Sequence, residues 1–464
     1  MGRIYIENGF IVETNEIFKG NILISDGQIK RVERGASTAS VVKNCTVIDA
    51  TDLYVFPGFI DAHTHYGVGE GSNKSSDTFY SGSKAAAFGG ITTVIDFSDQ
   101  IREKSLLESS QMRIEEAKES FVDFALHQGI YFYHDKLEEE IKELVNFGIR
   151  VLKIFTTYKE AGLFLDLQYW QPLFELAKKY QLLVTVHAES QTVLEEIEKS
   201  LTNKMYPASM QNHLRPPLAE ASAILEVGEI AKKYNLPLYI VHVSSKDALN
   251  ALNNLSQFIP VCGETAPHYL TLTDSLLDSQ NGNLYVVNPP LRKAEDNKRL
   301  LEALKNGELS VVATDHCSYS KEQKLREKEC QKVLGGISGS ETMASLLYSS
   351  AVVTNYITIS EMRKLLCDNP AKAFGLYSQK GSLEPNSDGD IALFKIGIKE
   401  KIEINNLHGL CDYTPYENTQ IDGKVITTIK GGKIIVQDGK LVADKPCGKF
   451  LKSNRSSVFD RVQL

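Results

Sequence analysis

The run Val151-Leu152-Lys153-Ile154-Phe155 reads as a short β-strand covered on both faces, because all of its residues except the lysine are apolar. Similar runs alternate with helical segments between residues 55 and 375, which is typical of βα units and a parallel sheet. Eight such units close into a (β/α)8 barrel, so an α/β protein of this TIM-like class is predicted. The predicted strands are Phe59–Thr64, Thr92–Phe97, Val122–His127, Val151–Phe155, Leu182–His187, Leu238–His242, Pro260–Glu264 and Leu309–Thr314.

The two ends of the chain have a different texture, in which short β-type runs alternate with turn dipeptides such as Asn8-Gly9 and Gly431-Gly432. We therefore expect residues 1–54 and 376–464 to build one small β-sandwich domain together, with a C-terminal tail, beside a barrel at residues 55–375. An open doubly wound sheet is the alternative for the central region, but its glycine-rich dinucleotide turn is missing.

Composition narrows the class of protein. The 464 residues carry a formal net charge of −8, whereas proteins that bind nucleic acid usually have a basic surface. No apolar run approaches the roughly 20 residues of a membrane-spanning helix, and the N-terminus lacks the apolar stretch of a secretory signal. Seven widely spread cysteines without a Cys-x-x-Cys pair favour a reducing cytoplasm. We predict a cytoplasmic protein with no nucleic-acid or membrane partner.

Polar side chains able to bind a metal accompany several of the predicted strands. Taken singly, each has an ordinary structural explanation, such as a histidine bonded to a backbone carbonyl or an aspartate that caps the next helix. Together they collect at the end of the barrel where barrel enzymes keep their active sites. Imidazole and oxygen donors without thiolates suit zinc, manganese or iron, with zinc preferred. These residues are His63, His65, Lys153, His187, His242 and Asp315.

Lys153 needs a separate explanation, because all of its neighbours in the strand are apolar. A lysine is rarely buried without a partner, since its charged form loses hydration. One explanation is an edge position from which the amine reaches solvent along its stem. The other is that burial favours the neutral amine, which reacts with carbon dioxide to give a carbamate, an anionic ligand able to bridge two metal ions.

Four motifs contain most of these residues. Residues 55–65 end in His63-Thr64-His65, and residues 153–159 begin with Lys153-Ile154-Phe155. The other two motifs are His187-Ala188-Glu189 and Thr314-Asp315-His316-Cys317. They resemble the motifs of the cyclic amidohydrolases, and within that family those of the dihydropyrimidinase and D-hydantoinase branch. The resemblance extends over nearly the whole chain.

This resemblance implies a binuclear metal centre and a hydrolytic reaction. The catalytic tyrosine of the branch falls five residues after the lysine, which is Tyr158 here. A metal-bridged hydroxide would attack a cyclic amide, Tyr158 would stabilise the oxyanion, and Asp315 would act as general base and then as general acid. The ring would open to an N-carbamoyl product. The implied ligands are His63, His65 and Asp315 on one ion, His187 and His242 on the other, and a carboxylated Lys153 as the bridge.

Several positions bear on the substrate. Dihydroorotases usually carry an arginine where this chain has Gly67, and the Glu-Pro-Gly run typical of allantoinases is missing shortly afterwards. Both departures favour hydantoin or dihydropyrimidine as the small-molecule substrate. Conversely, Asn288 and Gly335 replace a serine and an asparagine that are usual in the branch, at positions that grip the ring amides. The resemblance also places Tyr66 and Phe155 beside the group on the ring carbon. An allantoinase or a dihydroorotase-like enzyme remains the alternative.

The sequence disfavours two further function classes. A non-catalytic scaffold of the same fold is disfavoured, because such relatives have lost the metal ligands that this chain keeps. A deaminase on the same barrel is disfavoured, because those relatives use a single ion and lack the bridging lysine found here as Lys153. The resemblance further implies a homotetramer, in which the tail at residues 445–464 either reaches a neighbouring subunit or is disordered.

Overall fold

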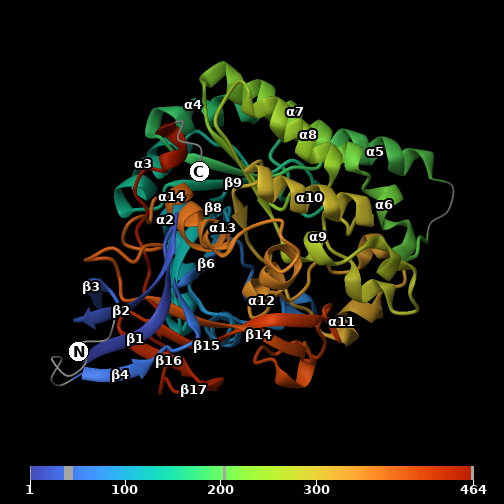
Figure 1. The fold of residues 1–464 in the computed structure, drawn as a ribbon. Helices are drawn as coiled ribbons and strands as arrows, with labels where there is room; N and C mark the ends of the chain where they lie inside the picture. Colours follow the sequence, from blue (N-terminus) through green and yellow to red (C-terminus); the bar gives the residue numbers. More distant parts are fainter. Residues whose placement is uncertain (1, 36–44, 202–204, 461–464) are drawn as a thin grey trace.

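The central region folds into an eight-stranded parallel sheet in the computed structural model, which describes residues 2–35, 45–201 and 205–460 (Figure 1). The strand order β13-β12-β11-β10-β9-β8-β7-β6 follows the sequence, so each strand pairs with the next one along the chain. The strands are β6 (Phe59–Asp61), β7 (Ile91–Ser98), β8 (Asp123–Gly129), β9 (Val151–Phe155), β10 (Leu183–His187), β11 (Leu238–Ile240), β12 (Val261–Thr265) and β13 (Val311–Val312).

The sheet closes into a barrel where its first and last strands meet. Thr64, shortly after β6, forms a parallel bridge with His316, shortly after β13. The His65 N–H donates a hydrogen bond to the carbonyl of His316 at 2.8 Å. All eight predicted strands are present, and the predicted (β/α)8 barrel is confirmed.

Strands β6, β11 and β13 end earlier than predicted. After β11 and β13, the chain leaves the ladder near a residue with a left-handed backbone conformation. His242, two residues after β11, has a φ of 42°, and Asp315, three residues after β13, has a φ of 50°. Neither value is compatible with an extended strand.

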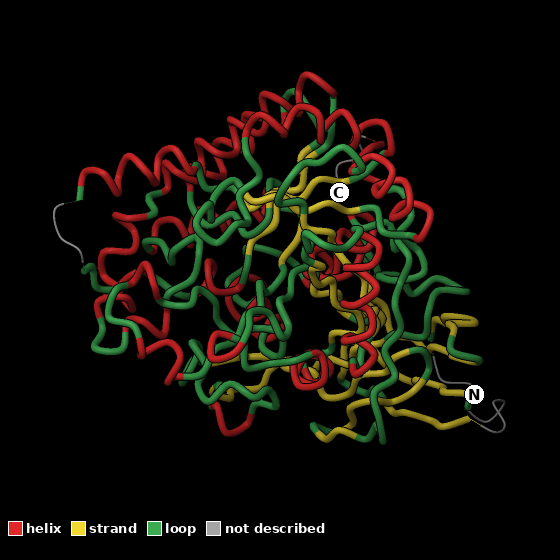
Figure 2. Tube along the Cα trace, turned by 180° about the vertical axis from the view of Figure 1, so that it is seen from behind, coloured by secondary structure: helices red, strands yellow, loops and turns green. Residues whose placement is uncertain are grey.

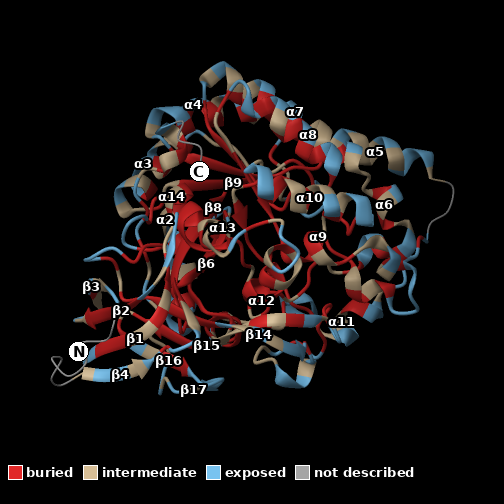
Figure 3. Cartoon of the chain, viewed as in Figure 1, coloured by how far each residue is buried: buried red, intermediate tan, exposed pale blue. Residues whose placement is uncertain are grey.

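Helices follow the strands and cover the barrel (Figure 2), while its strands lie among the buried residues (Figure 3). In α3, the buried residues Leu137, Ile141 and Leu144 share one face at helical spacing, and Gly148 ends the helix with a left-handed φ of 111°. None of the described helices combines the length and apolar character needed to cross a membrane. The helices are α1 (Phe79–Phe88), α2 (Leu106–Glu116), α3 (Leu137–Phe147), α4 (Trp170–Tyr180), α5 (Gln191–Ser200), α6 (Gln211–Leu214), α7 (Pro217–Tyr234), α8 (Lys246–Ser256), α9 (Pro267–Thr271), α10 (Ala294–Asn306), α11 (Lys321–Arg326), α12 (Met343–Leu347), α13 (Ile359–Arg363) and α14 (Asn369–Ala373).

Both ends of the chain contribute to the second sheet, as predicted. Its path is β17-β16-β15-β14-β5-β1-β2-β3, and β4 pairs with β1. Strand β5 joins the two ends, because Val55 lies opposite Ile11 of β1 on one side and opposite Leu393 of β14 on the other. The strands are β1 (Arg3–Val12), β2 (Ile17–Ser25), β3 (Gln28–Arg34), β4 (Cys45–Asp49), β5 (Leu53–Pro57), β14 (Ile391–Lys401), β15 (Gln420–Lys430), β16 (Lys433–Gln437) and β17 (Lys440–Leu441).

A buried ionic cluster ties this second sheet to the barrel. The Lys380 ammonium lies 2.6 Å from a carboxylate oxygen of Asp123, at the start of β8, and 2.6 Å from one of Asp390, just before β14. A third carboxylate, that of Asp388, lies 2.9 Å away. The lysine therefore occupies the centre of this acidic group and compensates its charge.

The C-terminal tail lies on the barrel of its own chain up to residue 460. The Leu451 N–H donates to the carbonyl of Phe124 in β8 at 2.7 Å, and Phe450 forms a parallel bridge with the same residue. Up to residue 460 the tail thus packs on its own barrel, whereas a contact with a neighbouring subunit stays a prediction. Residues 461–464 lie outside the described part of the chain.

Candidate active site

A cavity of about 360 Å³ opens at the carboxyl ends of the barrel strands. All six predicted metal ligands line it, and so do four of the five predicted substrate contacts. The donors therefore meet at one end of the barrel although they are far apart in the sequence. The ligands are His63, His65, Lys153, His187, His242 and Asp315, and the four contacts are Phe155, Tyr158, Asn288 and Gly335.

One group of donors in this cavity consists of His63, His65 and Asp315. The Nε2 atoms of the two histidines lie 3.1 Å apart, and each lies 3.2 Å from Oδ1 of Asp315. The three ligand atoms are close enough together to hold one metal ion. Two imidazoles and a carboxylate are a donor set that suits zinc and other divalent transition metals.

The second group consists of His187, which ends β10, and His242, which follows β11. His187 Nδ1 and His242 Nε2 lie 3.0 Å apart. Nδ1 of His242 is buried and has no hydrogen-bond partner among the described residues. The rings of His242 and His63 stack with their centroids 5.5 Å apart, so the two groups are adjacent.

Two buried glutamates orient two of the histidine rings by binding the ring nitrogen that does not face the other donors. The Nδ1–H of His63 donates to Oε1 of Glu264 at 2.8 Å, and the Nε2–H of His187 donates to Oε2 of Glu189 at 2.8 Å. Such bonds select the ring tautomer and leave the other nitrogen free to act as a ligand. Neither of these roles was predicted from the sequence. Glu264 ends the seventh predicted strand, so the rule that located the other donors would also have located it.

Lys153 lies inside β9 with 1% of its surface exposed, and its Nζ has no hydrogen-bond partner in the described part of the chain. The ring centroids of Phe155 and Phe97 lie 4.9 Å and 5.1 Å from this atom. Burial lowers the pKa of Lys153 to about 8, so a larger fraction of the amine is neutral near neutral pH than in water. The amine does not reach solvent. A buried, unpartnered amine in the same cavity as both groups of ligand atoms fits a bridging metal ligand made from lysine.

Tyr158 lies on the loop after β9, and its ring centroid is 5.0 Å from that of His187. Burial raises the pKa of Tyr158, so the phenol keeps its proton at neutral pH and can donate a hydrogen bond. Arg215 lies over the tyrosine ring at 5.2 Å and donates to Glu189 through Nε at 2.9 Å and Nη2 at 2.6 Å. Arg215 thus connects the tyrosine to the carboxylate that orients His187. Nothing in its sequence neighbourhood marked it for this role.

Three residues of the cavity have a backbone conformation that is rare for residues with a Cβ atom. The φ angles are 67° for Tyr158, 42° for His242 and 50° for Asp315. Such conformations are costly and persist where the surrounding structure determines them, often at functional sites. Here the chain turns sharply at each strand end and brings the side chain to the cavity.

Tyr66 does not reach the cavity, contrary to the prediction that it contacts the substrate. Its side chain is fully buried elsewhere, with the hydroxyl 3.0 Å from Oγ of Ser340. The Tyr66 N–H donates to Oδ2 of Asp96 at 3.0 Å, and the ring packs edge-on against Phe79 and His316. The predicted contact rested on the position of Tyr66 in the family resemblance, whereas these contacts hold its ring outside the cavity lining.

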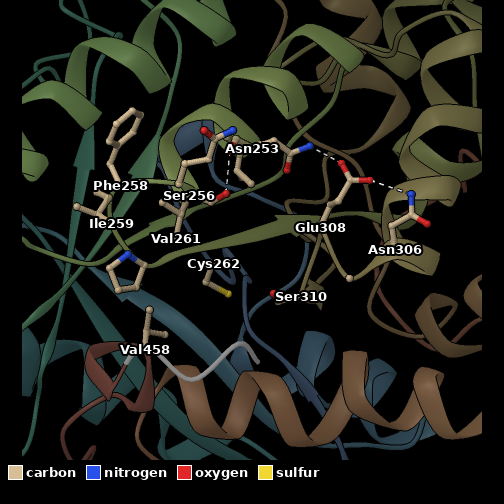
Figure 4. A pocket seen from close by; sticks show the side chains of 14 residues that line it. Asn253, Ser256, Phe258, Ile259, Val261, Cys262, Asn306, Glu308, Ser310 and Val458 are labelled. Carbon is tan, nitrogen blue, oxygen red and sulfur yellow. Dashed lines mark hydrogen bonds between the residues drawn. The ribbon is translucent and has the colours of Figure 1, made fainter.

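The opposite end of the barrel has a cavity of its own, of about 400 Å³, at the amino ends of β12 and β13 (Figure 4). Among its described lining residues, Glu308 alone carries a charge, and none is a histidine. The carboxylate of Glu308 already accepts hydrogen bonds from Asn306 at 3.1 Å and from Arg299 at 3.1 Å. The lining of this cavity therefore offers no group of metal donors comparable to that at the carboxyl end.

Comparison with known proteins agrees with this geometry. The model of the amidohydrolase family matches residues 54–435. A D-phenylhydantoinase from Escherichia coli O1:K1 is 33% identical over 463 residues, which cover 97% of this chain and 98% of that protein. The crystal structure of a dihydropyrimidinase from Brevibacillus agri has a TM-score of 0.93 and 31% identity, covering 98% of this chain and 99% of that one. An L-hydantoinase from Arthrobacter aurescens has a TM-score of 0.89 and 26% identity, covering 97% of this chain and 100% of that one. The chain belongs to the amidohydrolase family.

Proposed function

We propose that the protein hydrolyses the ring of a hydantoin or a dihydropyrimidine and releases an N-carbamoyl amino acid. The observation that carries this proposal is the convergence of six donors on one cavity, around the unpartnered amine of Lys153. Similarity to a D-phenylhydantoinase and a dihydropyrimidinase over nearly the whole chain supports the same reaction class.

The donor set supports a centre of two divalent ions, with zinc as the first choice and manganese or iron as alternatives. Bound there, the ions would lower the pKa of water toward neutrality and polarise the amide carbonyl. The neutral amine of Lys153 would react with carbon dioxide to form an N–C bond and release one proton, which would give an anionic carbamate ligand with two oxygens. The residues that would hold the ions are His63, His65 and Asp315 for one, His187 and His242 for the other, and carboxylated Lys153 for both.

Asp315 is proposed to move the proton that the reaction requires. Its Oδ1 lies 3.2 Å from Nε2 of both His63 and His65, at the centre of the first group of donors. We infer that this carboxylate accepts the proton of the attacking water and returns it to the ring nitrogen that leaves. Without that proton, the nitrogen would have to depart as an amide anion, which is a very poor leaving group.

Asn288, Gly335 and Phe155 are proposed to surround the ring. The side chain of Asn288 lines the cavity together with Tyr158, and its Oδ1 accepts a hydrogen bond from Nε2 of Gln211 at 3.1 Å. Gln211 thereby fixes the orientation of the Asn288 amide. Phe155 lines the same cavity and offers an apolar surface to the substituent on the ring carbon.

The Tyr158→Phe variant should keep its metal and lower kcat by about a hundredfold, because it removes one donor to the developing oxyanion. Initial rates and metal content by mass spectrometry check this expectation. Tyr131→Phe is the matched control: Tyr131 lines the same cavity, but its hydroxyl donates to Asp99, and we expect a much smaller loss. An unchanged kcat in Tyr158→Phe would remove the tyrosine from the mechanism.

A panel of five rings tests the proposed reaction. We expect the purified protein to open hydantoin, 5-phenylhydantoin and dihydrouracil, with the carbamoyl group of the product followed by a colorimetric assay. Turnover restricted to allantoin or dihydroorotate would shift the assignment to the corresponding alternative. Failure on all five rings in protein that contains its metal would contradict the proposal.

A further inference from the structure

Lys324 is a second fully buried lysine near the active site, and its environment differs from that of Lys153. It lies in α11, and its Nζ donates to the carbonyl oxygens of Val286 at 2.6 Å, Leu334 at 2.8 Å and Gly336 at 3.0 Å. Burial lowers the pKa of Lys324 to about 7. The three carbonyls favour the charged form, because an ammonium group has three N–H donors and each finds one acceptor here, whereas a neutral amine would leave one carbonyl without a hydrogen bond. In the part of the chain that the structure describes, Lys324 makes no ion pair, and the hydrogen bonds of its Nζ are all to backbone carbonyls.

The three carbonyls belong to the two segments that form one wall of the active-site cavity. Val287 and Asn288 line the cavity from one segment, and Gly335 and Gly336 line it from the other. The segments touch each other, because the Gly336 N–H donates to the Val286 carbonyl at 3.2 Å. Lys324 therefore holds both segments from the side away from the cavity.

The bonds to Val286 and Leu334 also determine where two N–H groups point. The peptide groups 286–287 and 334–335 are trans, so the C=O and the N–H of each lie on opposite sides. With the carbonyls directed to Lys324, the N–H groups of Val287 and Gly335 are directed away from it, toward the cavity that both residues line. Neither N–H has a hydrogen-bond acceptor among the residues that the structure describes.

We propose that Lys324 is a positioning residue for the substrate: it fixes and polarises these two peptide groups, so that the N–H groups of Val287 and Gly335 donate to the ring carbonyl that is not attacked. This inference rests on the proposed ring hydrolysis. A hydrogen bond from a cationic donor is stronger than one from a neutral donor, and it polarises the peptide so that its own N–H becomes a better donor. The ammonium thus acts on the substrate through the backbone without touching it.

The KM values of two related substrates distinguish a positioning role of Lys324 from a purely structural role. Hydantoin and 2-thiohydantoin share the attacked carbonyl, but the second compound carries sulfur, a weaker acceptor, in place of the other carbonyl oxygen. For the wild-type protein we expect a KM about tenfold higher for 2-thiohydantoin, because hydrogen bonds to that atom are weakened. In Lys324→Met, which keeps the length of the side chain but has no N–H donor, we expect the KM for hydantoin to rise about tenfold. The ratio of the two KM values should then fall toward one.

Helix α11 also supplies a control variant for this experiment. Lys321→Met removes an exposed lysine from the first turn of α11 and should leave both KM values and their ratio as in the wild type. Metal content and melting temperature are measured for each variant. A folded, metallated Lys324→Met with the wild-type ratio would overturn the inference while leaving the proposed function intact. If Lys324→Met does not fold, a wild-type protein that opens both rings with equal KM overturns it instead. Wild-type protein that opens no ring at all contradicts the proposed function itself.

Discussion

Lys153→Ala should lose bound metal and lower kcat/KM by roughly a thousandfold or more, since it removes the ligand proposed to bridge both ions and with it several kcal/mol of stabilisation. The side chain that disappears is buried, has no hydrogen-bond partner among the described residues and lies in the same cavity as the four histidines. Metal content by mass spectrometry and initial rates with hydantoin measure the effect. A short carboxylic acid added to the variant should restore part of the metal and part of the rate, because it can occupy the place of the carbamate.

Lys159→Ala is the matched control for this experiment. Lys159 follows Tyr158 on the same loop, but its side chain is 63% exposed and its Nζ lies 3.4 Å from Oε1 of Glu195. Such a surface pair contributes at most about 1 kcal/mol to stability, so metal and activity should be retained. Full metal content and normal turnover in Lys153→Ala without added acid would contradict the bridging role of the lysine.

Asp315→Asn should lower kcat by roughly a thousandfold, because an amide of nearly the same shape cannot accept the proton from water. The effect on KM should be smaller, since the loss falls on proton transfer more than on binding of the ring. The variant keeps one side-chain oxygen at the position that lies 3.2 Å from both His63 and His65, so part of the metal should remain bound. Turnover is therefore normalised to the bound metal in each preparation.

The Asp99→Asn variant is the matched control: it distinguishes proton transfer by Asp315 from a general effect of negative charge in the cavity. Asp99 also lines the cavity, but its carboxylate accepts the hydroxyl of Tyr131 and belongs to neither group of metal donors. We expect its kcat to fall by less than about tenfold, the scale of one lost hydrogen bond. Equal losses in the two aspartate variants, at equal metal content, would show that Asp315 does not serve as the proton acceptor.

The sequence predicted both the barrel and the ligand set for the same physical reason. Parallel strands buried on both faces require short apolar runs, and the carboxyl ends of these strands meet at one end of the barrel. A donor such as His187 or His242 stands at the end of an apolar run, and this alone predicts that it lies at the carboxyl end of the barrel. No knowledge of the rest of the fold is needed for that prediction. Strand lengths were less predictable, because the left-handed φ of His242 and Asp315 ends regular pairing before the apolar pattern stops.

By itself, the sequence determined the architecture and the candidate metal ligands, since both depend on local periodicity and on which residue ends each run. Only the tertiary structure decided which side chains support them. These contacts join residues that are far apart in the sequence, and they depend on loops that have no regular sequence pattern. They are the contacts of Glu264 with His63, of Arg215 with Tyr158, and of Lys324 with the cavity wall. The position of Tyr66 was likewise decided by the tertiary structure: its N–H donates to Asp96 of β7, and its ring lies outside the cavity. Contacts between distant segments are set by chain packing in three dimensions, which a pattern along one dimension does not encode.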